Sequence, residues 1–319
     1  MKKHIPWVAG VVLPALLFVA PLFVPRYYVG LLILTFIYGI FAMSLDILTG
    51  YTGLPSLGHA AFFGVAAYTV GILNVKIFQN FGLELLAGLS VTAVIAAVFG
   101  LLTVRSRGIY FLMITLALSM VLWGLASNWT ALTGGHDGLA GVSRPAIGPI
   151  SLDFGVTSHF YYLVLIFFLI AVALMFFVAR SPFGVALLGI RESETRMSVL
   201  GYNVWFYKYV NFIVTGLFAG LAGILFAYYN GFVHPSALGI GTSAKVLFMF
   251  ILGGPGTLFG PLAGAGVIVF LENLISAYSE RWQMFLGAIY VLIIIFAPRG
   301  IYGPMRQLIR RVLFWDLSQ

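Results

Sequence analysis

The feature that most constrains this chain is a series of apolar runs, most of them long enough to cross a membrane. They cover residues 5 to 24, 27 to 48, 56 to 73, 84 to 104, 109 to 127, 160 to 179, 209 to 229, 244 to 258, 262 to 278 and 283 to 298. An α-helix needs ~20 apolar residues to cross ~30 Å of hydrocarbon. The runs therefore predict an all-α, polytopic membrane protein with about ten spans.

The composition excludes a soluble fold. Hydrophobic residues make up 61% of the 319 residues and charged residues only 8%, against roughly a quarter charged in soluble proteins. We expect one transmembrane domain over residues 1 to 319, since no stretch is polar enough for a separate globule. The first run follows Lys2 and Lys3 without a small-residue cleavage site before Arg26, so we interpret it as a retained span.

The basic residues predict the orientation. The formal net charge is +8, and most of the 17 lysines and arginines lie at the two ends and in alternate connecting segments. Cytoplasmic loops are enriched in Lys and Arg, so both termini and the loop 180 to 208 should be cytoplasmic. The loop 128 to 160 would then lie on the opposite side. In such a chain the positive charge reports topology and does not indicate nucleic-acid binding.

One long polar segment reads as a helix, from Ser181 to Lys208. Ser181 is a good N-cap, Pro182 suits the first helical position, and Gly201 is a plausible end. Apolar residues recur on one face, namely Phe183, Leu187, Ile190, Met197 and Leu200, and the other flank carries Arg191, Glu192, Glu194 and Arg196. Two interpretations fit an amphipathic helix here: it lies passively in the headgroups, or it docks into a groove on a cytoplasmic partner.

Two stretches interrupt the apolar pattern with glycine and proline, Gly50 to Gly64 and Leu252 to Gly266. Paired broken helices in the two halves of a chain point to a transport pathway, whereas close packing of small residues explains the same glycines without one. Ionisable residues inside spans are Asp46, His59 and Glu272. We interpret Asp46 as an interfacial anchor, His59 as a packing residue, and Glu272 as either a pathway lining or a partner of Asn273 or Arg281.

The sequence offers no pattern typical of an enzyme. It has no cysteine, its histidines are scattered, and Gly253 to Thr257 lacks the lysine of a phosphate-binding loop. No G-x-S-x-G motif marks a nucleophilic serine. We therefore expect no catalytic residue, no metal site and no cofactor in this chain.

Five motifs in order carry a family resemblance: Ser44 to Leu73, Arg107 to Leu118, Asn128 to Gly141, Ser181 to Asn203 and Leu252 to Ala265. Together they resemble the permease subunits of branched-chain amino acid ABC importers, more closely the M-type (LivM-like) subunit, from about Tyr28 to Gly303. The resemblance implies a second, LivH-like permease subunit, two cytoplasmic ATPases that bind ATP and Mg²⁺, an extracytoplasmic binding protein, and a place in the bacterial cytoplasmic (inner) membrane.

The resemblance also implies a role for the polar segment, namely ATPase coupling. The residues assigned to it are Phe183, Gly184, Leu187, Ile190, Arg191, Glu192, Glu194, Arg196 and Gly201. Glu194 and Gly201 match an acidic residue and a glycine of importer coupling loops, but Thr195 and Arg196 replace the alanine pair usual in other importers.

The function implied is import of leucine, isoleucine and valine by alternating access, with work supplied by the ATPases. We assign the substrate pathway to Ser56, Gly58, His59, Gly254, Gly256, Thr257 and Glu272, where broken helices offer backbone groups and helix ends. The alternatives are a related importer for urea or short amides, a stand-alone secondary transporter or channel, and a scaffolding subunit.

Overall fold

The computed structural model describes residues 17–21, 23–144 and 157–278, together with residues 281, 284, 285, 287, 288 and 291. The predicted spans 5 to 24 and 283 to 298 lie largely outside the described residues, as do residues 145–156 of the predicted outer loop. Within the described part, five helices are long and apolar enough to cross a membrane. The prediction of an all-α polytopic protein is thereby confirmed, whereas the count of ten spans and the side of the termini stay predictions.

The helices follow the predicted runs closely. The longer elements are α2 (Arg26–Leu45), α3 (Ala60–Lys76), α4 (Phe81–Thr103), α5 (Gly108–Asn128), α7 (Thr157–Arg180), α8 (Pro182–Glu192), α10 (Val204–Asn230), α11 (Ile240–Gly253) and α12 (Gly260–Ser276). The short elements are the π-helical η1 (Asp46–Tyr51), α6 (Thr130–Thr133), η2 (Gly135–Asp137), α9 (Glu194–Val199) and η3 (Pro235–Leu238). Two short strands, β1 (Leu139–Ala140) and β2 (Phe232–Val233), pair antiparallel.

The bundle is built around α2 and α10. α2 packs against α7, α10, α11 and α12, and α10 packs also against α3 and α4. Both are mostly buried, whereas α4, α5 and α7 each leave a broad apolar face open. A helix that is apolar all round suits a buried position. α2 and α10 are the most buried of the long helices because they pack most extensively against their neighbours.

Small residues let α10 approach its neighbours closely. Gly216 lies against Ala96 of α4, Gly220 against Thr92 of the same helix, and Gly223 against the Phe63 carbonyl of α3. A Cβ on Gly223 would collide with that carbonyl. Gly216 and Gly220 are four positions apart, a spacing of small residues that is typical of tight helix pairs in membranes.

Two short helices begin where non-helical backbone ends. α3 follows residues 53–59, which are not helical, and α11 follows the extended Gly239 after the short helix η3. The first turns of these helices meet, because the Ala60 backbone N–H donates to Ser243 Oγ at 3.3 Å. The interruption expected between Gly50 and Gly64 is therefore present before α3, and the bond joins residues 183 positions apart. The second expected interruption, Leu252 to Gly266, lies at the connection between α11 and α12 rather than before α11. The run predicted for 244 to 258 is α11, which starts earlier, at Ile240, and ends at Gly253, within the first residues of the glycine–proline stretch.

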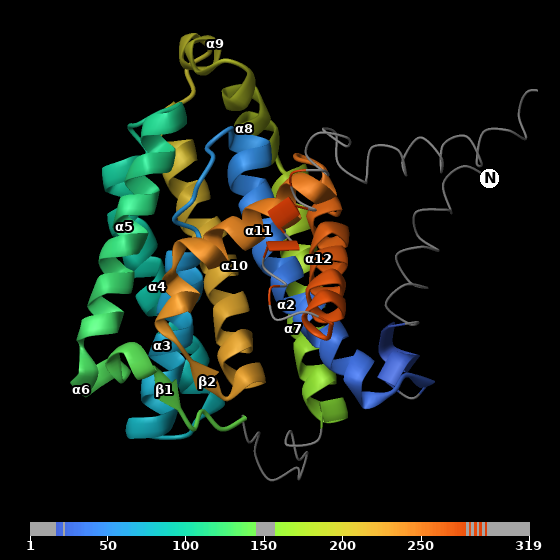
Figure 1. The fold of residues 1–319 in the computed structure, drawn as a ribbon. Coiled ribbons are helices and arrows are strands. Elements are labelled where there is room, and N and C mark those ends of the chain that lie inside the picture. The colour runs from blue at the N-terminus through green and yellow to red at the C-terminus, as the bar shows by residue number, and fades with distance from the viewer. Residues whose placement is uncertain are drawn as a thin grey trace, which may run out of the picture.

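The two ends of the bundle differ (Figure 1). α8 and α9 project at one end, whereas α6, β1 and β2 lie at the other. At this second end, the buried Glu84 carboxylate accepts bonds from the Asn74 amide at 3.1 Å, the Asn80 backbone N–H at 3.1 Å and the Tyr228 hydroxyl. Asn74 Oδ1 accepts in turn from the Ser143 backbone N–H at 2.8 Å. This network fastens the β1 region to α3, α4 and α10.

Candidate functional site

The polar segment forms two helices rather than the single one expected. Ser181 Oγ accepts from the Gly184 N–H at 3.3 Å and caps α8, with Pro182 at its first position, as predicted. Ser193 is extended, and its Oγ caps α9 by accepting from the Arg196 N–H at 3.3 Å. A serine that bonds neighbouring backbone favours a helix start over a helix interior, and this accounts for the break. After α9 the chain turns at Gly201, which has a φ of 88°.

The apolar face of α8 and α9 packs mainly on this chain itself. Leu187 and Ile190 are 0% and 1% exposed, Met197 is also buried, and Phe183 stacks on Tyr207 of α10 with ring centroids 5.4 Å apart. These side chains are thus not presented to a partner in this structure. An amphipathic pattern shows that one face of a helix is covered, but it does not show what covers it. The sequence alone therefore could not tell packing against this chain from contact with headgroups or with a partner.

Leu200, which was predicted on the same face, is instead exposed, together with apolar side chains outside that face. Val199 is 84% exposed and Leu200 is 70% exposed, at the tip that α9 forms at the top of Figure 1. Val185 and Leu188 of α8 are exposed too. Val199 and Leu200 therefore give the tip of this segment an accessible apolar surface.

Arg191 connects α8 to both interrupted stretches. Its guanidinium donates to the Gly50 carbonyl in η1 and lies beside Gly256. The buried Asp46 carboxylate accepts from the Gly256 N–H at 2.5 Å and from the Leu258 N–H at 2.8 Å. We call these five residues the Arg191 junction. It joins α8, the end of α2 and the α11–α12 connection.

The predicted pathway residues Gly254, Gly256 and Thr257 therefore lie at the α8 end of the molecule. Thr257 Oγ1 donates to the Gly254 carbonyl at 2.7 Å and accepts from the Gly260 N–H at 3.1 Å, which closes a compact turn. Leu258 has a φ of 59°, an uncommon conformation for a branched side chain. Asp46, expected to anchor in headgroups, instead holds this turn.

Glu194 ties α9 to two further elements. Its carboxylate pairs with Arg107 at 2.8 Å, just before α5, and with the buried Lys208 of α10. A recess of about 410 Å³ beside it is also lined by Arg105, Thr195 and Trp205. Ion pairs therefore hold the start of α9 to the residue before α5 and to α10. Val199 and Leu200, at the other end of α9, take no part in these ion pairs.

Ser56, Gly58 and His59 are packed inside the bundle. The Gly58 N–H donates to Ser56 Oγ at 3.3 Å, and Gly58 abuts the Thr115 backbone without room for a side chain. His59 is fully buried, with its Nε2 2.9 Å from Ser44 Oγ and its ring stacked 5.7 Å from Phe41. The hydrogen-bonded packing role preferred for His59 agrees with this position.

A large cavity lies elsewhere, between α2, α5, α10, α11 and α12, with a volume of about 980 Å³. Aromatic side chains from five helices line it, with α3 contributing Phe63 and the others being Tyr38, Trp123, Phe226 and Phe248, and the first turn of α11 borders it. We call it the α11 cavity. Ligand sites are typically concave and mostly apolar, with a few placed polar groups, and this cavity has that character.

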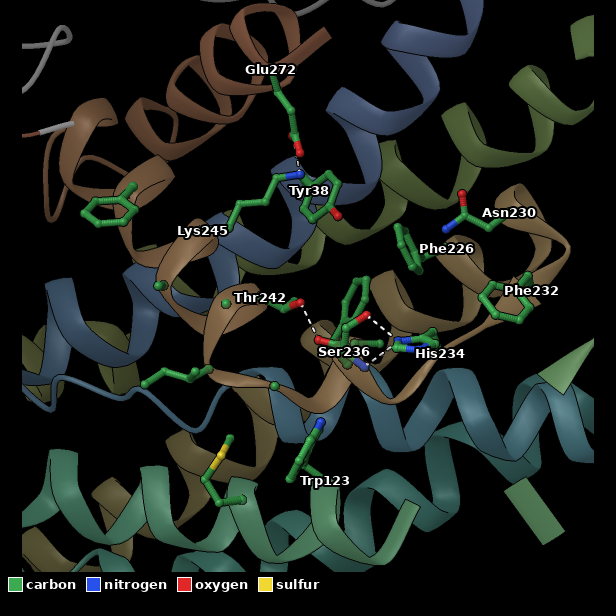
Figure 2. Close-up of a pocket in the computed structure, with 18 residues that line it drawn as sticks. Tyr38, Trp123, Phe226, Asn230, Phe232, His234, Ser236, Thr242, Lys245 and Glu272 are labelled. Carbon is green, nitrogen blue, oxygen red and sulfur yellow. Dashed lines mark hydrogen bonds and ion pairs between the residues drawn. The ribbon is translucent and has the colours of Figure 1, made fainter. Parts of the chain in front are cut away.

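The polar groups of the α11 cavity include an ion pair between Lys245 and Glu272 (Figure 2). Lys245 also lies over the Tyr38 ring, with its Nζ 4.2 Å from the centroid. Of the predicted pathway residues, Glu272 is the one that lines this cavity. Its partner is Lys245, which the sequence analysis did not name, where Asn273 or Arg281 was favoured.

Sequence reasoning missed Lys245 and the polar set of His234, Ser236 and Thr242. A usable signal existed, because Lys245 is an ionisable residue inside a short apolar run. The apolar run alone did not show that Lys245 faces a cavity. That became clear only from the structure, in which α11 starts at Ile240 and places Lys245 in the cavity wall. Among the described residues, no group of three His, Asp or Glu is placed to hold a metal ion.

Comparison with known proteins agrees with the motifs. The model of a family described as branched-chain amino acid transport system / permease component matches residues 27–297. The LivM permease protein of a high-affinity branched-chain amino acid transport system, from Escherichia coli (strain K12), is 31% identical over 90% of this chain and 72% of its own length. No solved structure is detectably similar.

Two more distant relatives broaden the picture. The LivH permease protein of the same Escherichia coli system is 23% identical over 83% of this chain and 91% of its own length. The ribose import permease protein RbsC of that organism is 28% identical over 79% of this chain and 78% of its own length.

Proposed function

Because this chain belongs to the family of branched-chain amino acid transport permeases, we propose that it is one membrane subunit of an ABC importer for leucine, isoleucine and valine. The proposed assembly contains a second, LivH-like permease subunit, two ATPases that bind ATP and Mg²⁺, and an extracytoplasmic binding protein. The similarity of this chain to both LivM and LivH proteins supports a pair of related permease subunits. The membrane would be the bacterial cytoplasmic membrane.

The observation that carries the coupling part of the proposal is the Arg191 junction. A surface helix that touches partner proteins transmits work only if it is connected to the parts that move. Arg191 provides this connection, since it bonds η1 and lies beside the α11–α12 turn. α8 and α9 are therefore proposed as the coupling element, with Val199 and Leu200 as its apolar contact points for the ATPases.

The proposed topology has about ten spans with both termini in the cytoplasm. It is supported by the positions of α8–α9 and of the β1–β2 region at opposite ends of the bundle. Basic residues favour the cytoplasmic side, and Arg105, Arg107, Arg191 and Arg196 all belong to the α8–α9 end. The binding protein would then approach the end formed by α6, β1 and β2.

In the proposed cycle, closure of the ATPases on ATP pulls α8 and α9, and the Arg191 junction moves η1 and the 254–258 turn with them. The predicted pathway residues then fall into three roles. Gly254, Gly256 and Thr257 belong to the moving turn, Ser56, Gly58 and His59 hold the chain leading into α3, and Glu272 lines the cavity. Access to the α11 cavity would alternate between the two sides as the bundle rocks.

The test is uptake by proteoliposomes that contain both permeases, the ATPases and ATP, with the binding protein outside. We expect accumulation of leucine, isoleucine and valine, and none of urea or short amides. Accumulation of urea in place of leucine would assign the chain to the alternative importer class. Leucine accumulation by the purified chain alone, driven by an ion gradient, would show a secondary transporter and contradict the proposal.

A further inference from the structure

The Lys245–Glu272 pair is unusual because both partners belong to apolar helices, α11 and α12, and both line a cavity. Their side chains are 21% and 22% exposed, which is enough for contact with a cavity occupant. A single charge inside a bilayer is costly, so such residues keep a partner of opposite sign. A ligand that separates this pair must therefore supply both a negative and a positive group.

A free α-amino acid meets this requirement. It carries one carboxylate and one ammonium group, so its carboxylate can take Lys245 while its ammonium takes Glu272, and the charges stay balanced. A neutral amide such as urea offers no such exchange. The pair thus favours a zwitterion over the neutral substrates of the alternative importer class.

The surroundings of the pair fit the same ligand. Gly239 to Thr242 form the start of α11 at the cavity wall, and no side chain caps this helix. The first N–H groups of a helix lack intrahelical acceptors and carry partial positive charge, which favours the carboxylate on the Lys245 side. Phe226 and Trp123 offer an apolar wall for a branched side chain.

The view into the cavity agrees with these roles. Figure 2 shows Lys245 extending past Tyr38 toward Glu272. Thr242, Ser236 and His234 lie below this pair in the view. The Thr242 hydroxyl donates a hydrogen bond to the Ser236 carbonyl at 2.8 Å. The Thr242 hydroxyl is therefore already bonded within the wall, whereas the charged pair is partly exposed to the cavity.

We propose that Lys245 and Glu272 recognise the two charged ends of the amino acid in the translocation cavity, opening their ion pair as it enters. This inference rests on the proposed function and extends it to the residues that select the substrate class. It treats both residues as substrate-binding groups rather than as a structural pair.

The test uses the complete reconstituted importer with radiolabelled leucine. The double variant Lys245→Gln/Glu272→Gln removes both charges and leaves no unpaired charge behind. We expect leucine uptake to fall roughly tenfold to a hundredfold, the effect of losing hydrogen bonds to charged groups, while ATPase co-purification stays at the wild-type level. Uptake at the wild-type rate would show that the pair is only structural and would overturn the inference.

The swapped variant Lys245→Glu/Glu272→Lys provides a second test should the neutral variant fail to assemble. It keeps an ion pair but places the carboxylate beside the first turn of α11, which disfavours the substrate carboxylate there. We expect reduced uptake, and uptake at the wild-type rate would again overturn the inference. Failure of the wild-type complex to import leucine would instead overturn the proposed function itself, so the two failures are distinguishable.

Discussion

Arg191 lies on a surface helix, but its side chain connects that helix to a segment distant in the sequence. Its guanidinium reaches the Gly50 carbonyl across 141 residues of sequence, and its aliphatic stem packs against Gly53. Gly53 has a φ of 75°, which glycine adopts without strain. One side chain therefore joins the coupling element to the segment that leads into α3.

Replacement of Arg191 tests this connection. Arg191→Ala removes a hydrogen bond from a charged donor, worth about 1.5–3 kcal/mol, and leaves the exposed tip of α9 unchanged. We expect ATP-driven uptake to fall at least tenfold while the ATPases still co-purify. Arg191→Lys is the matched control because it keeps the charge and much of the stem. Uptake at the wild-type rate in Arg191→Ala would exclude a coupling role for this residue.

Glu84 gives a stability prediction at the other end of the molecule. Its carboxylate accepts from Asn74, Asn80 and Tyr228 in a buried site. Glu84→Gln replaces one accepting oxygen by an NH2 group, which donates and cannot accept, so a buried donor loses its partner at a cost of about 1–3 kcal/mol.

We expect a lower temperature of thermal unfolding for purified Glu84→Gln, and a smaller decrease for Tyr228→Phe, which removes a donor without leaving the carboxylate unpartnered. An unchanged unfolding temperature in Glu84→Gln would show that the network does not stabilise the fold.

At the scale of elements, α8 and α9 separate buried from exposed apolar residues. Leu187 is buried inside this chain, and Leu187→Asp would bury an unpaired charge at a cost of roughly 3 kcal/mol or more. Leu200→Asp places the same charge in solvent. We expect Leu187→Asp to reduce the amount of folded protein, and Leu200→Asp to insert normally but to lose roughly tenfold or more in ATPase affinity.

Co-purification of the ATPases and the yield of monodisperse protein distinguish these effects. If Leu200→Asp retained the ATPases fully, the tip of α9 would not be the docking surface. If Leu187→Asp folded normally and lost only the ATPases, the buried face would be the docking face after all.

Much of this element structure was predictable from sequence. The apolar runs located the helices, and Ser181, Pro182 and Gly201 located the ends of the polar segment, because length and capping are local properties. The break at Ser193 also depends on local sequence, because the Ser193 side chain caps α9. It was not predicted because the residues on both sides of Ser193 favour a continuous helix. The Arg191 junction and the Lys245–Glu272 pair were not predictable, since hydropathy says nothing about which helices are neighbours.

At the scale of the whole molecule, the fold brings two interrupted regions together. α3 and α11 meet at their first turns through Ala60 and Ser243, while the ends of α2 and α11 meet at the Arg191 junction. The α11 cavity lies between these helices and α12. In the proposed cycle, a displacement of α8 at one end would reach the elements that line the cavity through these contacts.

In the proposed cycle, work enters the bundle through the tip of α9. Because the chain has no native cysteine, a single introduced cysteine reports the position and the contacts of this tip directly. A single Leu200→Cys is placed in the complete importer in native membranes, with Trp129→Cys at the α6 end as the control. We predict that Leu200→Cys is labelled by impermeant maleimide only from the cytoplasmic side and crosslinks to an ATPase subunit, whereas Trp129→Cys does neither. Labelling of Leu200→Cys only from outside, without an ATPase crosslink, would contradict the account.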